Sequence, residues 1–197
     1  MNPVASSDVL RRIEACGALL RGHFRLSSGL HSDQYVQCAR LFQDPAYAEE
    51  LGRMLAALAP AKADLVVSPA LGGLLIGHET AKALGRPFLF TERADGAMAL
   101  RRGFEVAPGQ TFLVVEDVLT TGKSTREVLE AVRALGAVPV GALSVIDRGL
   151  SPDALGVPFA SLVRLELRTF QPDDCALCRE GLPLVKPGSR PDPKTKG

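Results

Sequence analysis

Two patterns of apolar residues alternate along this chain. Apolar positions three or four residues apart predict helices at about 6–22, 44–59, 74–84 and 124–135. Short apolar runs predict strands at 65–68, 88–90, 112–115, 138–146 and 159–167, with two extended pieces between residues 24 and 38. Strands that alternate with helices are typical of a parallel sheet covered by helices. We therefore predict an α/β fold.

Length, composition and charge narrow the class of protein. The 197 residues suffice for one sizeable core, and 46% hydrophobic and 23% charged residues are ordinary for a globular domain. A formal net charge of +1 gives no general attraction to nucleic acid or to a membrane surface. No apolar run approaches membrane-spanning length, and the N-terminus lacks a basic stretch followed by an apolar one. We expect a cytoplasmic protein.

The strongest chemical signal follows the predicted strand 112–115. Glu116 and Asp117 come directly after it, and a turn with hydroxyl groups and a glycine leads into the next helix. Ligands of parallel α/β sheets bind at the carboxyl ends of the strands. The helix begins with a capping-box pattern, Ser124 to Glu127, and free N–H groups at a helix start attract phosphate. The pattern predicts carboxylates beside a phosphate-binding loop.

This stretch also resembles two other kinds of segment. The run Gly122-Lys123-Ser124 is similar to the end of a nucleotide-binding P-loop, but that motif needs glycine where Asp117 stands. A nucleoside triphosphatase is therefore disfavoured. The second alternative is an ordinary strand-to-helix turn whose acids are simply solvated. Neither alternative accounts for both the acids and the loop.

Residues 114–124 resemble the signature of type I phosphoribosyltransferases, which use phosphoribosyl pyrophosphate (PRPP). The resemblance implies that Glu116 and Asp117 contact the ribose hydroxyls and that 120–124 hold the 5′-phosphate. The run 69–73 resembles the pyrophosphate loop of the same family. The implied PRPP-binding set is Glu116, Asp117, Val118, Leu119, Thr120, Thr121, Gly122, Lys123, Ser124, Ala70, Leu71, Gly72, Arg93, Arg101 and Arg102.

Two further segments resemble the orotate-specific members of that family. Residues 24–36 are similar to their N-terminal hood, and Asp147-Arg148 is similar to their orotate-binding position. The resemblance implies that Arg148 binds orotate, with Thr120 and Tyr35 as helpers, because a planar guanidinium can pair with a carboxylate through two hydrogen bonds. A purine-base phosphoribosyltransferase and a non-catalytic PRPP-sensing regulator remain the alternatives.

The segment 92–109 has poor periodicity and stands where the family has its mobile loop. Arg93, Arg101 and Arg102 are its cations, and Arg93 completes the implied catalytic set with Glu116 and Asp117. The segment contains no lysine or histidine, and arginine does not titrate near neutral pH. We therefore expect it to neutralise pyrophosphate charge without donating a proton.

The resemblance also implies the overall organisation of the chain. We expect a type I phosphoribosyltransferase fold, with a central, mostly parallel sheet flanked by helices and a small N-terminal hood. Residues 1–197 should form one domain: a hood at about 1–40 plus a C-terminal segment, a core at about 44–170 and a mobile tail at about 186–197. The expected substrates are PRPP and orotate, and the expected cofactor is Mg²⁺, held through PRPP and water. We expect a homodimer, with no nucleic-acid or membrane partner.

Four cysteines are too sparse for a disulfide scaffold in a chain of this size. Cys16 lies on an apolar helix face and is predicted to be a packed thiol. Cys175 and Cys178 form a C-x-x-C pair, which is half a zinc site, a redox pair or a pair without either role. No second C-x-x-C or His pair at zinc-site spacing is evident. Cys16, Cys38 or a second subunit remain the candidates that could complete a metal site.

Overall fold

The computed structural model describes residues 3–26 and 28–187. The helices are α1 (Pro3–Ala15), α2 (Pro45–Ala56), α3 (Gly73–Leu84), α4 (Lys123–Arg133) and α5 (Ala176–Arg179), with 3-10 turns at Cys38–Gln43 and Pro172–Asp174. The strands are β1 (Leu19–Arg25), β2 (His31–Val36), β3 (Leu65–Pro69), β4 (Phe88–Ala94), β5 (Ala97–Leu100), β6 (Thr111–Leu119), β7 (Val138–Asp147), β8 (Phe159–Arg164) and β9 (Thr169–Phe170).

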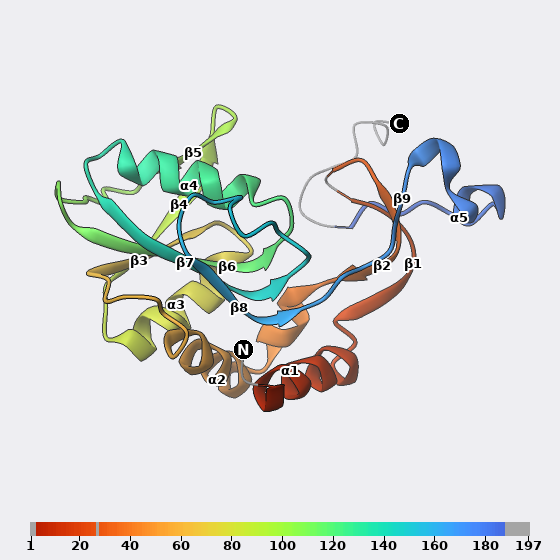
Figure 1. Ribbon diagram of the computed structural model, residues 1–197, viewed down its shortest axis with the longest axis horizontal. Coiled ribbons are helices and arrows are strands. Elements are labelled where there is room, and N and C mark those ends of the chain that lie inside the picture. Colours follow the sequence, from red (N-terminus) through yellow and green to blue (C-terminus); the bar gives the residue numbers. More distant parts are fainter. Residues whose placement is uncertain (1–2, 27, 188–197) are drawn as a thin grey trace.

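A six-stranded sheet in the order β5-β4-β3-β6-β7-β8 forms the centre of the fold. Its neighbouring strands are parallel except for β5, which pairs antiparallel with β4. Helix α4 lies on one face of the sheet, whereas α2 and α3 lie on the other (Figure 1). The predicted α/β class and the mostly parallel central sheet flanked by helices are confirmed.

Side chains that alternate along the central strands build two separate hydrophobic cores. On β6, Leu113 and Val115 join the core shared with α2, whereas Phe112 and Val114 join the core shared with α4. Successive residues of a strand point to opposite faces, and a sheet covered on both faces needs apolar residues at every position. This requirement explains the uninterrupted apolar run before Glu116.

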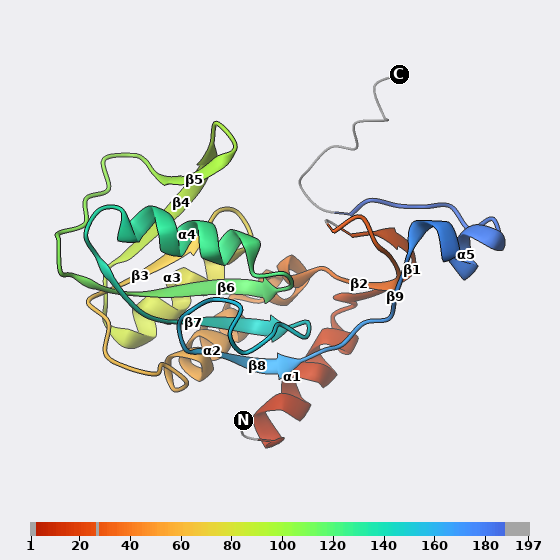
Figure 2. The ribbon, with the colours of Figure 1, turned by 45° about the horizontal axis from the view of Figure 1, so that its top comes forward.

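A second sheet, β1-β2-β9, lies beside the central one, and we refer to it as the small sheet. Strand β2 pairs antiparallel with both neighbours, and its pairs with β9 are His31 with Phe170 and Ser32 with Thr169. The carboxyl ends of β6, β7 and β8 point toward this small sheet (Figure 2). Ligand-binding strand ends therefore face a second layer of the protein.

The first helix ends earlier than predicted. Residues 6–22 were expected to be helical, but α1 stops at Ala15 and Leu19 begins β1. Gly17 has a φ of 65°, its N–H donates to Glu14 O, and the N–H of Ala18 donates to Ile13 O. This is the Schellman arrangement, in which a glycine closes a helix. The apolar pattern continued past residue 17 because β1 also buries side chains.

The start of α4 and the segment 92–109 also differ from expectation. Gly122, with a φ of 69°, stands at the N-cap of α4, so the predicted capping box from Ser124 to Glu127 is not formed. Glu127 instead binds Arg93. The segment 92–109 is not one loop, because the end of β4 and the whole of β5 form a hairpin within it.

The predicted mobile tail at about 186–197 lies outside the described residues from 188 onward. Within the described ranges, no helix combines the length and apolar character needed to cross a membrane.

Candidate active site

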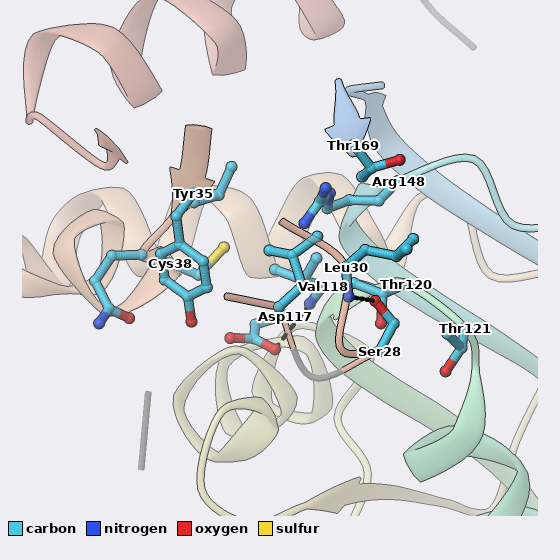
Figure 3. A pocket seen from close by; sticks show the side chains of 13 residues that line it. Ser28, Leu30, Tyr35, Cys38, Asp117, Val118, Thr120, Thr121, Arg148 and Thr169 are labelled. Carbon is cyan, nitrogen blue, oxygen red and sulfur yellow. Dashed lines mark hydrogen bonds between the residues drawn. The ribbon is translucent and has the colours of Figure 1, made fainter. Parts of the chain in front are cut away.

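Two adjoining cavities open where β6 and β7 end beside the small sheet. The first has a volume of about 350 Å³ and is lined by Leu26, Ser28, Leu30, Tyr35, Val36, Gln37, Cys38, Asp117, Val118, Thr120, Thr121, Arg148 and Thr169. The second, of about 280 Å³, is lined by Ser28, Glu116 and residues 118–125. Figure 3 shows the first cavity, with Tyr35, Asp117 and Arg148 around it. Both cavities share Ser28 and the start of the loop after β6.

The carboxylates of Glu116 and Asp117 are held on the last part of β6. Glu116 Oε1 accepts from the N–H of Asp117 at 3.2 Å, and Asp117 Oδ1 accepts from the N–H of Val118 at 2.8 Å. Burial raises the pKa of Glu116 well above its usual value, and the adjacent Asp117 raises it further. Burial also raises the pKa of Asp117. A buried acid beside a half-buried one favours a ligand that donates hydrogen bonds or carries positive charge.

The loop between β6 and α4 lines the second cavity and supplies backbone donors. Gly122 takes a left-handed conformation, and a methyl group in its place would meet Leu155 at 2.8 Å. The guanidinium of Arg126 donates hydrogen bonds to Thr121 O at 3.0 Å and to Ala154 O at 3.1 Å. These two hydrogen bonds hold the loop in position. The helix start and its free N–H groups form the type of site that binds phosphate. Lys123 and Ser124 belong to this lining.

The loop between β3 and α3 approaches the carboxylates from another side. The N–H of Ala70 donates to Thr91 O at 2.8 Å, and Leu71 is largely exposed. A methyl group at Gly72 would lie 2.8 Å from Asp117 Oδ1, so a side chain at this position would clash with the carboxylate where it now lies. These three residues line neither cavity, but Gly72 borders Asp117, which does. The structure thus brings the predicted pyrophosphate loop to the edge of the site.

Arg148, after β7, and Tyr35, on β2, lie on different sides of the first cavity (Figure 3). Arg148 follows β7, and its backbone N–H donates to Leu119 O at 2.8 Å. Among the described residues, no hydrogen-bond partner reaches its buried Nε, and burial lowers the pKa of the guanidinium. The pKa of Tyr35 is raised by burial and then by Asp117. An unpaired, half-buried guanidinium favours an anionic ligand in this cavity.

The predicted cations of the segment 92–109 lie away from both cavities. Arg93 binds the carboxylate of Glu127 and the carbonyl oxygen of Gly96. Arg102 binds Glu92 through two hydrogen bonds of 2.7 and 2.8 Å. Arg101 is exposed, and none of the three arginines is among the residues that line the cavities. A contact between them and a ligand requires a different arrangement of this segment.

Sequence reasoning missed several residues that line the first cavity. Ser28 and Leu30 lie on the turn between β1 and β2, within the segment singled out as the hood but not assigned a contact. Cys38 is buried at the wall, and burial raises the pKa of its thiol well above the usual value. Thr169 comes from the short strand β9. No local pattern marks Thr169, because its position depends on its pairing with Ser32.

Comparison with known protein families agrees with this geometry. Residues 39–154 match the family model described as the phosphoribosyl transferase domain, which is more than half of the chain. The chain therefore belongs to the phosphoribosyltransferase family.

Individual relatives narrow the assignment. The chain is 48% identical over 183 residues to the orotate phosphoribosyltransferase of Caldanaerobacter subterraneus subsp. tengcongensis, covering 92% of this chain and 96% of the relative. It is 49% identical over 179 residues to that of Thermotoga maritima, covering 90% and 96%. The crystal structure of orotate phosphoribosyltransferase from Aeropyrum pernix superposes with a TM-score of 0.66 at 29% identity, covering 80% and 93%. Within the family, the chain is an enzyme of the orotate phosphoribosyltransferase group.

Proposed function

We propose that this enzyme transfers the phosphoribosyl group of PRPP to orotate in a Mg²⁺-dependent reaction, giving orotidine 5′-monophosphate and pyrophosphate, a step of pyrimidine nucleotide synthesis. The observation that carries this proposal is the guanidinium of Arg148, whose buried Nε has no hydrogen-bond partner among the described residues, in a cavity that continues past Asp117 to the phosphate-binding loop. A base that carries a carboxylate suits such a guanidinium, whereas an unsubstituted purine offers it no anion. The names of the relatives support the same substrates.

The two cavities suggest where each part of the substrates binds. The 5′-phosphate fits the second cavity, against the hydroxyl groups and backbone donors of 120–124. The ribose hydroxyls fit Glu116 and Asp117, because carboxylates accept their hydrogen bonds. Orotate fits the first cavity between Tyr35 and Arg148. Thr120 lines both cavities, so it can contact both substrates.

The chemistry requires little from a protein base. A ring nitrogen of orotate attacks the anomeric carbon of PRPP, and the bond from that carbon to the pyrophosphate oxygen breaks, with pyrophosphate keeping the electron pair. Positive charge develops on the ribose, and the carboxylate of Asp117 lies at the site where the ribose is expected. A preorganised group of this kind contributes about 3 to 4 kcal/mol in the transition state.

Mg²⁺ suits this site through the oxygen atoms of bound PRPP and water, the hard ligands that this ion prefers, with the carboxylates of Glu116 and Asp117 next to that space. When bound, the ion would neutralise charge on the pyrophosphate. Arg93 can assist only after it leaves Glu127, so we propose that the segment 92–109 rearranges over bound PRPP. A homodimer whose segment 92–109 serves the neighbouring site is part of the same proposal.

The direct test is the loss of orotate absorbance when the purified protein is mixed with orotate, PRPP and Mg²⁺. Loss that needs all three components supports the proposal. Asp117→Asn should lower kcat about a few hundredfold. The matched control Asp153→Asn, at an exposed loop position, should leave the rate unchanged.

Other outcomes of this assay would contradict the proposal. Consumption of adenine or hypoxanthine without consumption of orotate would indicate a purine-base enzyme. PRPP binding without turnover of any base would indicate a regulator. Unchanged activity of Asp117→Asn would refute the role assigned to this carboxylate.

A further inference from the structure

Four potential metal ligands converge on the far side of the small sheet, apart from the residues that line the active-site cavities. They are His23 on β1, His31 at the start of β2, Cys175 just before α5 and Cys178 within it. The nitrogen and sulfur atoms that they offer all lie within 4.8 Å of one another. Figure 1 shows α5 next to the strands of this sheet. Cys16 and Cys38, which the sequence left as candidates to complete a metal site, are not part of this cluster.

Four of the six distances between these atoms are close to those of a tetrahedral zinc site, and the other two are at most 4.8 Å. Zn–N bonds of about 2.0 Å and Zn–S bonds of about 2.3 Å at tetrahedral angles place two nitrogens about 3.3 Å apart and a nitrogen about 3.5 Å from a sulfur. His23 Nε2 lies 3.0 Å from His31 Nδ1 and 3.6 Å from Cys175 Sγ. Cys178 Sγ lies 3.7 Å from His23 Nε2 and 3.3 Å from His31 Nδ1. Little movement is needed to place one ion between the four atoms.

The surroundings of His23 match those of a metal-ligating histidine. Its Nδ1 lies 2.9 Å from Leu182 O, so this nitrogen can donate a proton to the carbonyl while Nε2 faces the cluster. Such a hydrogen bond from the second ring nitrogen fixes the tautomer that binds a metal. His23, His31 and Cys175 are buried, and Cys178 is exposed. Buried polar groups are hydrogen-bonded, and buried charges such as thiolates are paired or coordinate a metal.

The chain after Leu167 has little apolar support. In the described part of the chain, neither hydrophobic core includes a residue after Leu167. Leu182, Leu184 and Val185 are each 44–50% exposed. Apart from the contacts of His23, backbone hydrogen bonds join this segment to β1: Arg25 N–H donates to Val185 O and Val185 N–H donates to His23 O, both at 2.8 Å. Small units without a sufficient core are commonly held by a metal or a disulfide.

We propose that His23, His31, Cys175 and Cys178 bind a structural Zn²⁺ that fastens the C-terminal segment to the small sheet. Two thiolates and two imidazoles in tetrahedral arrangement select zinc, and four protein ligands leave no open position for catalysis. The ion would form four metal–ligand bonds, and the two cysteines would each release a proton on binding.

This ion would also support the first active-site cavity. His31 pairs with Phe170, and the adjacent pair joins Ser32 to Thr169, which lines that cavity. Leu30, directly before His31, lines it as well. Release of the metal should therefore loosen the strands that carry Leu30 and Thr169.

The first test measures the metal content of the full chain, purified without chelator and without a metal-binding tag. Elemental analysis should find one Zn²⁺ per chain. Cys175→Ser and Cys178→Ser should each lose most of the zinc, whereas the matched control Cys16→Ser, outside the cluster, should retain it. Retention of zinc by both cluster variants, or its absence from the wild type, would overturn the proposal.

A second test uses the wild-type protein only, so that misfolded variants cannot decide the outcome. Metal-free protein titrated with Co²⁺ should develop the intense visible absorption of a tetrahedral thiolate site at one equivalent, and Zn²⁺ should abolish it. Trypsin should cleave after Arg179 faster in the metal-free protein than in the zinc-loaded protein. A Cys175–Cys178 disulfide in freshly purified protein, or identical cleavage rates with and without Zn²⁺, would refute the proposal. Neither readout depends on the proposed transferase activity.

Discussion

Replacement of Arg148 by alanine should weaken orotate binding while leaving the fold intact. Among the described residues, no hydrogen-bond partner reaches the buried Nε, so the truncation breaks no hydrogen bond of that atom. A hydrogen bond to a charged group contributes about 1.5 to 3 kcal/mol, which corresponds to about a 10- to 150-fold rise in KM for orotate. The midpoint of thermal unfolding should stay near that of the wild type.

Initial rates measured at varied concentrations of orotate and of PRPP give a separate KM for each substrate. The KM for PRPP should change little, because Arg148 lines the first cavity and not the second. Arg148→Lys should recover only part of the loss, since lysine lacks the planar fork that pairs with a carboxylate. Arg133→Ala, an exposed position in the last turn of α4, is the matched control. Equal rises in both KM values would refute the assignment of Arg148 to orotate.

Three further predictions concern the carboxylates at the end of β6 and the loop that follows them. Burial raises the pKa of Glu116, so the wild type loses stability as the pH rises above the unfolded value of about 4.3. Glu116→Gln lacks that loss, so its unfolding free energy should exceed that of the wild type by more at about pH 8 than at about pH 5. Denaturant titrations that give the same difference at both pH values would contradict this. Gly72→Ala should displace the Asp117 carboxylate, whose Oδ1 would lie 2.8 Å from the new methyl group, and lower kcat without unfolding the protein; an unchanged kcat would show that the carboxylate can move freely. Arg126→Ala removes two hydrogen bonds, including that to Thr121 O, and should weaken PRPP binding by about 1 to 3 kcal/mol in calorimetry; PRPP affinity equal to that of the wild type would remove Arg126 from loop positioning.

Local chemistry in the sequence was sufficient to predict the five parallel strands of the central sheet, but not its antiparallel edge strand β5. The apolar runs at 65–68 and 112–115 lie within β3 and β6, because strands covered on both faces need apolar residues at every position. Asp44 caps α2 by accepting hydrogen bonds from the N–H groups of Ala46 and Tyr47, with Pro45 at the first turn, as the local pattern indicated. Predictions failed where two elements shared one apolar pattern, as at the boundary between α1 and β1.

The candidate site was only partly visible in the sequence. The residues from Glu116 to Ser124 are contiguous, and their spacing alone places acids beside a helix start. Arg93 was expected at the site, yet the structure pairs it with Glu127, because the hairpin of β4 and β5 lies against α4. Thr169 gave no signal, because two-residue strands have no recognisable period.

The sequence by itself determined the parallel strands of the central sheet, most of the helices and the contiguous loop that follows β6, because each depends on residues within one turn or one strand of each other. Only the tertiary structure decided which distant groups meet. It placed Tyr35, Asp117 and Arg148 around one cavity, and it brought the pair Cys175 and Cys178 to histidines about 150 positions earlier in the chain. Such contacts arise from strand pairing and sheet packing, which join segments without any local sequence period.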